Sequence, residues 1–415
     1  MSDNTVKLFT NAQIFDGNQD VLITGKSIKV ESGLITLVEG VSSETKGAEV
    51  IDCTGHTIMP GLIDAHIHAN TPTYSFYHND RMPASLLANH AADILEGMLQ
   101  RGYTAVRDAG GGDRGLYEAI EAGVIKGPRF FYAGKAISQT GGHGDMRPGD
   151  VVEPCNCGQY AGSISRVADG VDDVVKAVRE ELRQGAHQIK IFVSGGISSP
   201  TDPIWMPQFT EEEIRAAVYE ASTHRTYVMA HCHTDDGARR CAEYGVRTLE
   251  HGTEISYETA QVLAEKGVFV VPTLSTMWVI TTEGEQLGLP PASLEKIKGV
   301  YERTLQSIEN CERAGVKIGF GSDLLGSNYH LLQNDEFIHR GKVSRPIEVL
   351  RSATSVNAEI LQMTGKLGCI ASGAYADIIA VKGNPLEDLS LFNDPDHPIP
   401  LIVKGGKIIR NTIGS

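Results

Sequence analysis

The sequence predicts an α/β fold: a (β/α)8 TIM barrel with a small composite β-sandwich domain formed from both termini. The chain has 415 residues, which is more than one ordinary hydrophobic core accommodates. After about residue 60, short apolar runs alternate with longer amphipathic stretches, as in repeated strand–helix units around a parallel sheet. Short strand-like segments separated by Gly, Asn and Asp turns occupy the two ends of the chain.

Eight apolar runs in the middle of the chain are the predicted barrel strands. Each run ends in polar, glycine or histidine residues, as expected where a strand meets a turn. The carboxyl ends of barrel strands are where functional side chains collect, so these terminal residues form the candidate site. In chain order the runs cover 61–69, 104–110, 129–138, 187–196, 227–234, 247–253, 269–276 and 316–323.

The amphipathic stretches between these runs predict helices. Apolar residues recur at three- and four-residue spacing in 170–186, and 210–224 begins with Thr210 as N-cap followed by acidic residues. A third long helix is predicted over 294–315. The GLPPAS break within 276–293 predicts an irregular loop there.

The chain is expected to divide into three segments. Residues 1–59 and 366–415 carry the terminal strands, and neither segment alone has enough strands to bury a good core. The two segments are therefore predicted to combine into one β-sandwich. Residues 60–365 are predicted to form the barrel.

Composition excludes several classes of function. The net charge of −15 and the pI of about 5.4 argue against general binding to nucleic acid or to anionic membrane surfaces. The amino terminus lacks a basic segment followed by an apolar run, and no apolar stretch approaches the roughly 18 residues of a membrane span. A cytoplasmic location is expected.

The cysteine content indicates that the thiols are reduced and not paired in disulfides. Seven cysteines scattered over a long chain fit free thiols better than a disulfide framework. Cys155 and Cys157 form a CxC, which is not expected to bind metal because no second cysteine pair accompanies it.

His66 and His68, in MPGLIDAHIHAN, are the most informative pair in the chain. They end a strongly strand-like run, and alternate residues of a strand share a face, so both imidazoles can point at one location. Neutral imidazole is a preferred ligand of zinc. For the pair alone, buried histidines satisfied by hydrogen bonds are an equally good explanation.

Four more residues at strand ends extend this pattern. Lys190 lies between two isoleucines, where burying an unpaired ammonium would cost free energy. If the amine forms a carbamate with CO2, the side chain becomes an anionic group that can bridge two metal ions. The alternative is that Lys190 pairs with a neighbouring acid. His231 and His251 close the fifth and sixth strands. Asp323 ends the eighth, where a carboxylate can bind a metal and take a proton from a bridging water. Together the six residues indicate a metal site.

The chain resembles the amidohydrolase superfamily, specifically its binuclear branch with a carbamylated lysine. PGLIDAHIH, IKIFVSGG, EHG, GSD and GAYADIIAV carry this resemblance, which covers essentially the whole chain. RDAGG, SQTGGHGD and GGISSPTDP resemble more closely the prolidase-like enzymes, often labelled imidazolonepropionase-related. Those enzymes cleave dipeptides or N-acyl amino acids at the C-terminal residue.

The resemblance implies two divalent metal ions and CO2 held as a lysine carbamate. The ions are expected to be zinc, although the sequence itself does not distinguish zinc from manganese or cobalt. It makes Lys190, as N6-carboxylysine, the bridge between the metals. It makes His66, His68 and Asp323 ligands of the more buried metal, and His231 and His251 ligands of the other.

The resemblance also implies residues for the substrate. His143 would polarise the scissile carbonyl or hold the substrate. His233 would bind the substrate carboxylate, at a position where some relatives carry tyrosine. The alternative for His233 is that it supports the metal ligands without contacting the substrate. His330 is a further candidate near the same rim. Trp205 and Met206 are candidates for an apolar acyl pocket, or else they anchor their loop.

The expected function is hydrolysis of an amide bond in dipeptides (Xaa-Pro or related) or N-acyl amino acids through a metal-bridged hydroxide that Asp323 orients. Aromatic amides such as ochratoxin-type conjugates are included. The alternative is a cyclic-amide hydrolase or deaminase of the imidazolonepropionase type, in which a single metal is typical and the bridging lysine is missing, so Lys190 counts against it. The complete ligand set argues against a non-catalytic scaffold.

A nucleophilic serine or cysteine hydrolase has little support. No GxSxG elbow is present, and Cys232 lies between two strand histidines, where it should face the core as a buried thiol. The expected partners are a small-molecule or dipeptide substrate and, from the resemblance, further copies of the chain in a homo-oligomer.

Overall fold

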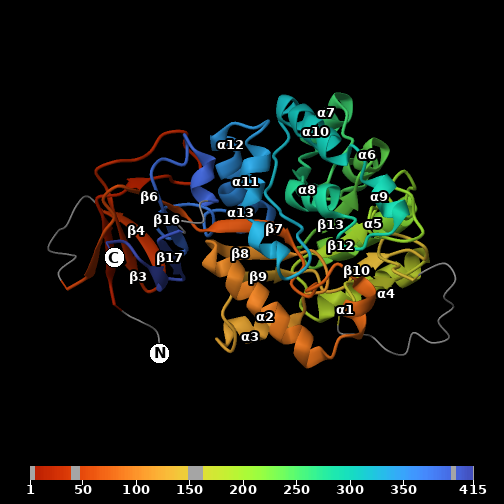
Figure 1. Ribbon diagram of the computed structural model, residues 1–415, viewed down its shortest axis with the longest axis horizontal. Coiled ribbons are helices and arrows are strands. Elements are labelled where there is room, and N and C mark those ends of the chain that lie inside the picture. Colours follow the sequence, from red (N-terminus) through yellow and green to blue (C-terminus); the bar gives the residue numbers. More distant parts are fainter. Residues whose placement is uncertain (1–4, 39–46, 148–161, 394–398, 415) are drawn as a thin grey trace.

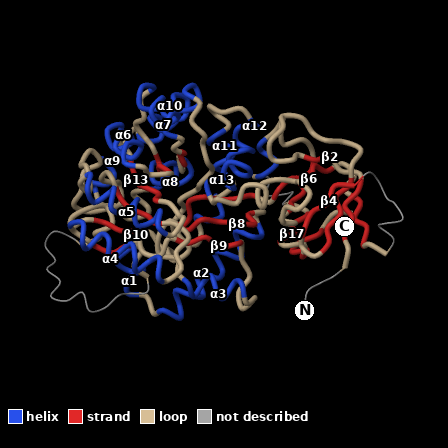
Figure 2. The backbone as a smooth tube through the Cα atoms, turned by 180° about the vertical axis from the view of Figure 1, so that it is seen from behind, coloured by secondary structure: helices blue, strands red, loops and turns tan. Residues whose placement is uncertain are grey.

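The computed structural model describes residues 5–38, 47–147, 162–393 and 399–414. Figures 1 and 2 show a larger part in which helices surround parallel strands, beside a smaller part made of strands from both ends of the chain. Cys155 and Cys157, whose lack of a metal role was predicted, lie outside the described residues.

Two parallel sheets occupy the larger part, which confirms the α/β class. The predicted strands 61–69, 104–110 and 187–196 are present as β7, β8 and β12 in these sheets. The first sheet consists of β7 (Leu62–Ile67), β8 (Tyr103–Asp108) and β9 (Arg129–Tyr132). The second has the order β11 (Ser165–Val167), β10 (Ala136–Ser138), β12 (Ile189–Phe192), β13 (Val228–Cys232), β14 (Thr248–His251) and β15 (Phe269–Val271).

Backbone contacts join the two parallel sheets at both edges. Ile318 forms a parallel bridge with Val270 of β15, and the neighbouring Phe320 accepts a 2.8 Å hydrogen bond from the Ala65 amide of β7. At the other edge, the amide of His187 donates to the Tyr132 carbonyl at 2.8 Å. These contacts follow the order that an eight-stranded barrel requires, and barrel closure stays a prediction.

Thirteen α-helices accompany the strands in the described part of the chain. Thr210 caps α5 as predicted, in a capping box with Glu213, whose carboxylate accepts from the Thr210 amide at 2.7 Å. The helices are α1 (Phe76–Arg81), α2 (Ala84–Gln100), α3 (Arg114–Glu121), α4 (Gly170–Arg183), α5 (Glu211–Thr223), α6 (Asp235–Tyr244), α7 (Tyr257–Lys266), α8 (Leu274–Glu283), α9 (Pro291–Lys296), α10 (Val300–Ala314), α11 (Asp335–Arg340), α12 (Pro346–Arg351) and α13 (Asn357–Ile360).

Two predicted strands differ from the structure. The run 129–138 is two strands, β9 and β10, because Gly134 adopts a left-handed conformation (φ 72°) and turns the chain between them. The run 316–323 forms only the isolated bridge at Ile318, so no eighth strand is assigned there.

Two predictions about helices differ in part from the structure. The irregular loop predicted within 276–293 is present only between α8 and α9, over residues 284–290, because α8 extends to Glu283. Helix α9 starts at Pro291, a position where proline lacks only an amide that a helix leaves unpaired. The predicted helix over 294–315 is interrupted, because Gly299 is left-handed (φ 67°) and separates α9 from α10.

Strands from both ends of the chain share the smaller part, seen at one side of Figure 1. The antiparallel pair of β6 (His56–Pro60) with β16 (Ile378–Lys382) joins the first 60 residues to the last 40 or so, and buried side chains from both ends form one apolar cluster. The division into domains stays a prediction. One sheet has the order β4 (Leu34–Val38), β3 (Ser27–Glu31), β1 (Lys7–Thr10) and β5 (Glu49–Asp52); the other has β18 (Lys407–Asn411), β17 (Leu401–Lys404), β16 (Ile378–Lys382), β6 (His56–Pro60) and β2 (Gln13–Ile14).

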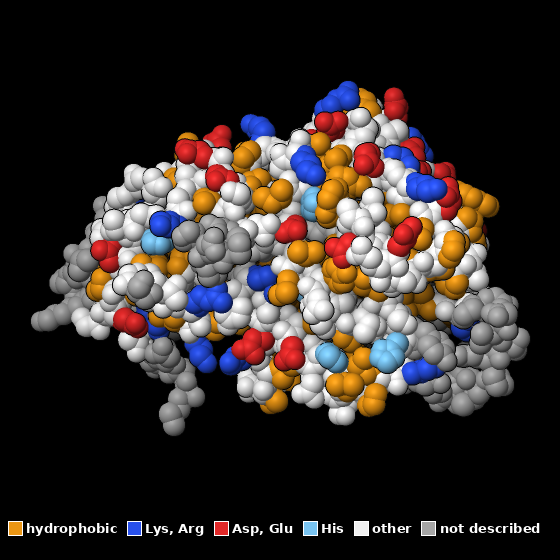
Figure 3. All heavy atoms as spheres, in the orientation of Figure 1, with side chains coloured by type: hydrophobic (Ala, Val, Ile, Leu, Met, Phe, Trp, Pro, Cys, Tyr) orange, Lys and Arg blue, Asp and Glu red, His pale blue; other side chains and the backbone are white. Residues whose placement is uncertain are grey.

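The surface is mixed in charge on the face shown in Figure 3, where acidic and basic side chains lie interspersed with apolar ones. Among the described residues, no helix has the length and apolar character needed to cross a membrane.

Candidate metal centre

The six predicted metal ligands meet in one cavity of about 580 Å³, a volume that includes its opening to solvent. They come from five places along the chain: the end of β7, β12, the ends of β13 and β14, and the segment after the Ile318 bridge. The positions of these residues in the predicted strands therefore indicated correctly that their side chains lie close together. The six are His66, His68, Lys190, His231, His251 and Asp323.

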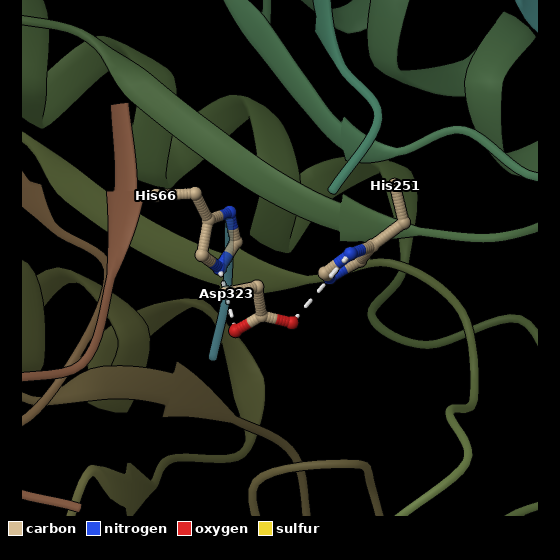
Figure 4. A group of neighbouring side chains, drawn as sticks. All are labelled: His66, His251 and Asp323. Atoms are coloured by element: carbon tan, nitrogen blue, oxygen red, sulfur yellow. Dashed lines mark ion pairs between the residues drawn. The ribbon is translucent and has the colours of Figure 1, made fainter. Parts of the chain in front are cut away.

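Asp323 lies at the centre of this group. Its Oδ1 is 3.4 Å from His66 Nε2 and 3.3 Å from His68 Nε2, and its Oδ2 is 3.9 Å from His251 Nδ1. One ligand atom from each of His66, His251 and Asp323 lies within 4.8 Å of the others. Figure 4 shows the two histidine rings on either side of the Asp323 carboxylate. Such spacing suits imidazole and carboxylate ligands of one metal centre.

The outer nitrogen of each histidine is already engaged, which leaves one nitrogen for a metal. The Nδ1 atoms of His66, His68 and His251 lie 2.7 Å from Glu250 Oε2, 2.8 Å from the Gly110 carbonyl and 2.7 Å from Thr273 Oγ1. Metal-binding histidines are usually held in this way by an oxygen behind them. The donor set therefore fits a metal centre.

His231 is held by its other nitrogen. Its Nε2 lies 3.3 Å from the Gly195 carbonyl, so Nδ1 is the nitrogen left for a ligand. Burial and the neighbouring histidines hold the pKa of His231 well below its usual range, and the neutral imidazole that results is the form that binds a metal.

Glu250 and Arg107 support this centre from behind, and the sequence analysis gave neither a role. Glu250 is fully buried and lies 2.7 Å from His66 Nδ1, while Arg107 donates to it from Nη2 at 2.9 Å. Burial opposes the charge of Glu250, but Arg107 and His66 outweigh burial and lower its pKa to about 2. Both residues stand within quoted motifs, EHG and RDAGG, which was the only signal available.

Lys190 has the surroundings that carbamate formation requires. It is 2% exposed, and within the described ranges it makes no hydrogen bond or ion pair; its Nζ lies 5.8 Å from the centre of the Phe192 ring. The alternative of a lysine paired with a neighbouring acid thus finds no such contact. Burial lowers the pKa of Lys190 to about 8, which raises the fraction of neutral amine, the form that reacts with CO2.

The sequence model of the Amidohydrolase family matches residues 57–408, from β6 into β18. The chain belongs to the amidohydrolase family.

Three similar proteins illustrate this amidohydrolase's relationships. An ochratoxinase from Aspergillus niger is 33% identical over 373 residues, covering 85% of this chain and 75% of the relative. The crystal structure of a prolidase complexed with N-methylphosphonate-L-proline is 44% identical, with a TM-score of 0.95 over 98% of this chain and all of the other. A crystal structure of a Xaa-Pro dipeptidase with methionine in its active site is 30% identical, with a TM-score of 0.88 over 98% of this chain and 100% of that one.

His143 of the amidohydrolase, for which a substrate contact is predicted, also lines the cavity. Its ring stacks on His231 with centroids 4.2 Å apart, and its Nδ1 lies 2.7 Å from Ser199 Oγ and 3.7 Å from Asp202 Oδ2. Because Nδ1 is held by these oxygens, Nε2 is the nitrogen free to meet a substrate.

His233 lines the cavity too, with Nδ1 2.8 Å from Thr253 Oγ1. Burial and the nearby His143 lower the pKa of His233 to about 3. A protonated His233 is therefore disfavoured in the metal-free site, and the neutral donor is the form that can meet a carboxylate.

Three other sequence candidates do not reach the cavity lining. His330 is 2% exposed, and within the described residues neither ring nitrogen has a partner. Trp205 is 75% exposed and Met206 is half-buried, and neither lines the cavity. The apolar lining comes instead from residues that the sequence analysis did not single out for the acyl group: Phe76, Met146, Ile164, Phe192, Ile197, Met277, Ile280 and Leu325.

Three residues at the centre have a strained backbone. His251, Thr273 and Asp323 have φ values of 73°, 51° and 52°, in the left-handed region that favours glycine. Each such residue costs about 1 to 3 kcal/mol, and such residues often cluster at active sites, where the surrounding structure holds them in place. The strained residue Thr273 also contacts a candidate ligand, because its Oγ1 lies within hydrogen-bond distance of His251 Nδ1.

Proposed function

We propose that this amidohydrolase hydrolyses the amide bond to a C-terminal amino acid, in Xaa-Pro or related dipeptides and in N-acyl amino acids. The observation that carries the proposal is the convergence of four histidines, Lys190 and Asp323 in one cavity, each metal-facing ring held from behind. The prolidase, dipeptidase and ochratoxinase similarities favour an amide with an amino-acid leaving group and extend the proposal to aromatic acyl groups.

The residues present would hold two divalent ions, for which zinc is our first choice. His66, His68 and Asp323 would bind one ion and His231 and His251 the other, with Lys190 as a carbamate between them. Two ions bound there would lower the pKa of a shared water and supply it for attack on the amide carbon.

The chain's own groups would handle the proton and the substrate. An Asp323 carboxylate oxygen would take the proton from the attacking water and pass it to the leaving amine. His143 would donate from Nε2 to the carbonyl oxygen as negative charge develops on it. His233, neutral and buried, would donate to the carboxylate of the leaving amino acid.

We also propose that the strand order closes into an eight-stranded barrel and that residues 1–59 and 366–415 form one composite β-domain. The backbone bonds at Tyr132 and Phe320 and the pairing of β6 with β16 support these two statements.

The test is a substrate panel assayed with zinc- and bicarbonate-loaded protein. The panel holds Xaa-Pro dipeptides, other dipeptides, N-acyl amino acids and the corresponding C-terminal amides, with metal content measured on the same sample. We expect turnover that requires a free C-terminal carboxylate and about two metals per chain. Turnover of cyclic amides or amino-purines instead, with one metal per chain, would overturn the proposal in favour of the deaminase-type alternative.

A further inference from the structure

Lys296, the last residue of α9, makes an unusual set of contacts with a segment far away in the sequence. Its Nζ donates to the carbonyl oxygens of Gly196, Ser199 and Asp202, at 2.9, 3.0 and 2.6 Å. An ammonium has three donors, and all three are used here. We call residues 196–202 the Lys296-bound segment.

The neighbouring Lys298 shows what an ordinary surface lysine does at this end of α9. Its side chain is 70% exposed and pairs with Glu295, which is 73% exposed. Exposed pairs of this kind contribute little to stability. Lys296 instead is half-buried and satisfies main-chain carbonyls.

The Lys296-bound segment needs an outside partner. No helix or strand is assigned to residues 196–202, so their carbonyls lack the hydrogen bonds of a regular element. Buried carbonyls without a partner cost free energy, and a cation that binds three of them at once fixes their relative positions.

The same segment holds His143 in the cavity. Ser199 Oγ lies 2.7 Å and Asp202 Oδ2 3.7 Å from His143 Nδ1. Gly196 lies under the ring: a Cβ there would be 2.2 Å from His143 Cε1. The position and tilt of the His143 ring thus depend on three residues of one segment, the same three whose carbonyls bind Lys296.

Asp202 is anchored firmly within this arrangement. It is fully buried, and its Oδ2 accepts from the Gly196 amide at 2.9 Å and from Gln208 Nε2 at 3.1 Å. Gln208 in turn accepts from the His143 amide at 3.0 Å through Oε1. Both the backbone and the ring of His143 are therefore tied to the segment.

We propose that Lys296 is a positioning residue for the amide hydrolysis, acting through the 196–202 segment to aim His143 Nε2 into the cavity. The inference rests on the proposed function, since it assigns His143 to the substrate carbonyl. Helix α9 follows α8, whose Thr276, Met277 and Ile280 line the same cavity as Ile197 and Ser198 of the segment.

The first experiment compares Lys296→Met with Lys298→Met in metal-loaded enzyme. We expect Lys296→Met to lower kcat about 10- to 100-fold, as displacement of a catalytic group by about 1 Å can do, with little change in KM or metal content. Lys298→Met should match the wild type. If Lys296→Met fails to fold, Lys296→Gln keeps two donors and is expected to lose less activity. Wild-type kcat in a folded Lys296 variant would overturn the proposal.

A double-mutant cycle with His143→Asn separates positioning from a merely structural role. If Lys296 acts through His143, then Lys296→Met should cost less than about threefold in the His143→Asn background. Equal losses in both backgrounds would show that Lys296 acts elsewhere and would overturn the inference.

A readout that needs no turnover distinguishes this inference from the proposed function. In metal-free protein, the imidazole NMR signals of His143, assigned by their loss in His143→Asn, should shift in Lys296→Met and stay unchanged in Lys298→Met. If no amide is hydrolysed but these signals shift, the proposed function fails while the positioning role holds. Unchanged signals would refute the positioning role.

Discussion

Replacing Glu250 by Gln should weaken both the fold and the metal centre. The carboxylate is fully buried between Arg107 Nη2 (2.9 Å) and His66 Nδ1 (2.7 Å), and it also accepts from Thr248 Oγ1 at 2.6 Å. Glutamine has the same shape but no charge, so it leaves the buried guanidinium without its partner. Removing one partner of a buried pair costs about 3 to 5 kcal/mol.

The pKa of Glu250 gives a second route to this magnitude. A shift from 4.5 to about 2 corresponds to about 3 kcal/mol, since one pKa unit is about 1.4 kcal/mol. Because the folded-state pKa is lowered, this stabilisation is fully present above pH 4.5 and is lost as the pH falls through about 2. Glu250→Gln should therefore be less stable at neutral pH, with a difference that shrinks in acid.

The assay is urea unfolding of chelated protein at pH 7 and at pH 4, with zinc affinity measured by competition against a chelator. We expect a loss of about 3 kcal/mol at pH 7 and a 10- to 100-fold weaker metal affinity, because the ring orientation of His66 is no longer fixed. Glu265→Gln, at a side chain 75% exposed, should stay within about 0.5 kcal/mol of the wild type. A loss below about 1 kcal/mol with unchanged zinc affinity would refute this reasoning.

Four other predictions follow from the same structure. Lys190→Ala should lose metal and activity, both partly restored by a short carboxylic acid, whereas Lys176→Ala on the exposed side of α4 should do neither; full activity in Lys190→Ala would exclude the carbamate. His143→Asn should lower kcat about 100-fold while metal content, measured by elemental analysis, stays constant. Gly196→Ala should also lower kcat, because its Cβ would displace the His143 ring; an unaffected kcat would contradict the assigned ring position. Burial raises the pKa of Glu336 to about 7, so its contribution to stability is greatest below pH 4.5 and falls as the pH rises through 7; unfolding midpoints should show that Glu336→Gln lacks this fall.

The convergence of the candidate metal ligands could be predicted from the sequence because each lies in or at the end of a strand-like run. His66 and His68 follow the two-residue period of a strand, so their side chains are expected on the same face. Because the carboxyl ends of parallel strands lie at one edge of a sheet, local sequence patterns were enough to predict that the candidate ligands lie close together. Lys190 stood out because a lone lysine between isoleucines conflicts with burial.

The supporting residues could not be predicted in this way. Glu250 lies 184 positions from His66, and Lys296 lies 100 positions from Gly196, so no local period links the partners. Their roles follow only from tertiary contacts. The loop predicted within 276–293 is shorter than expected for a related reason. Leu274, Met277 and Ile280 of α8 are buried against the core, and this packing outweighs the weak helical signal at the start of the segment.

The pairing of β6 with β16 has a consequence for how the protein is made. β6 leads directly into β7, which carries His66, yet its partner β16 lies about 300 residues later in the chain. At roughly 5 to 20 residues per second of synthesis, β6 waits some 15 to 60 seconds for its neighbour. Until the last strands leave the ribosome, the edge of β6 that pairs with β16 stays unpaired, next to the strand that carries the candidate ligand His66. Shortening the chain by its last 40 residues or so would therefore disturb a part of the candidate site that comes from the opposite end of the sequence.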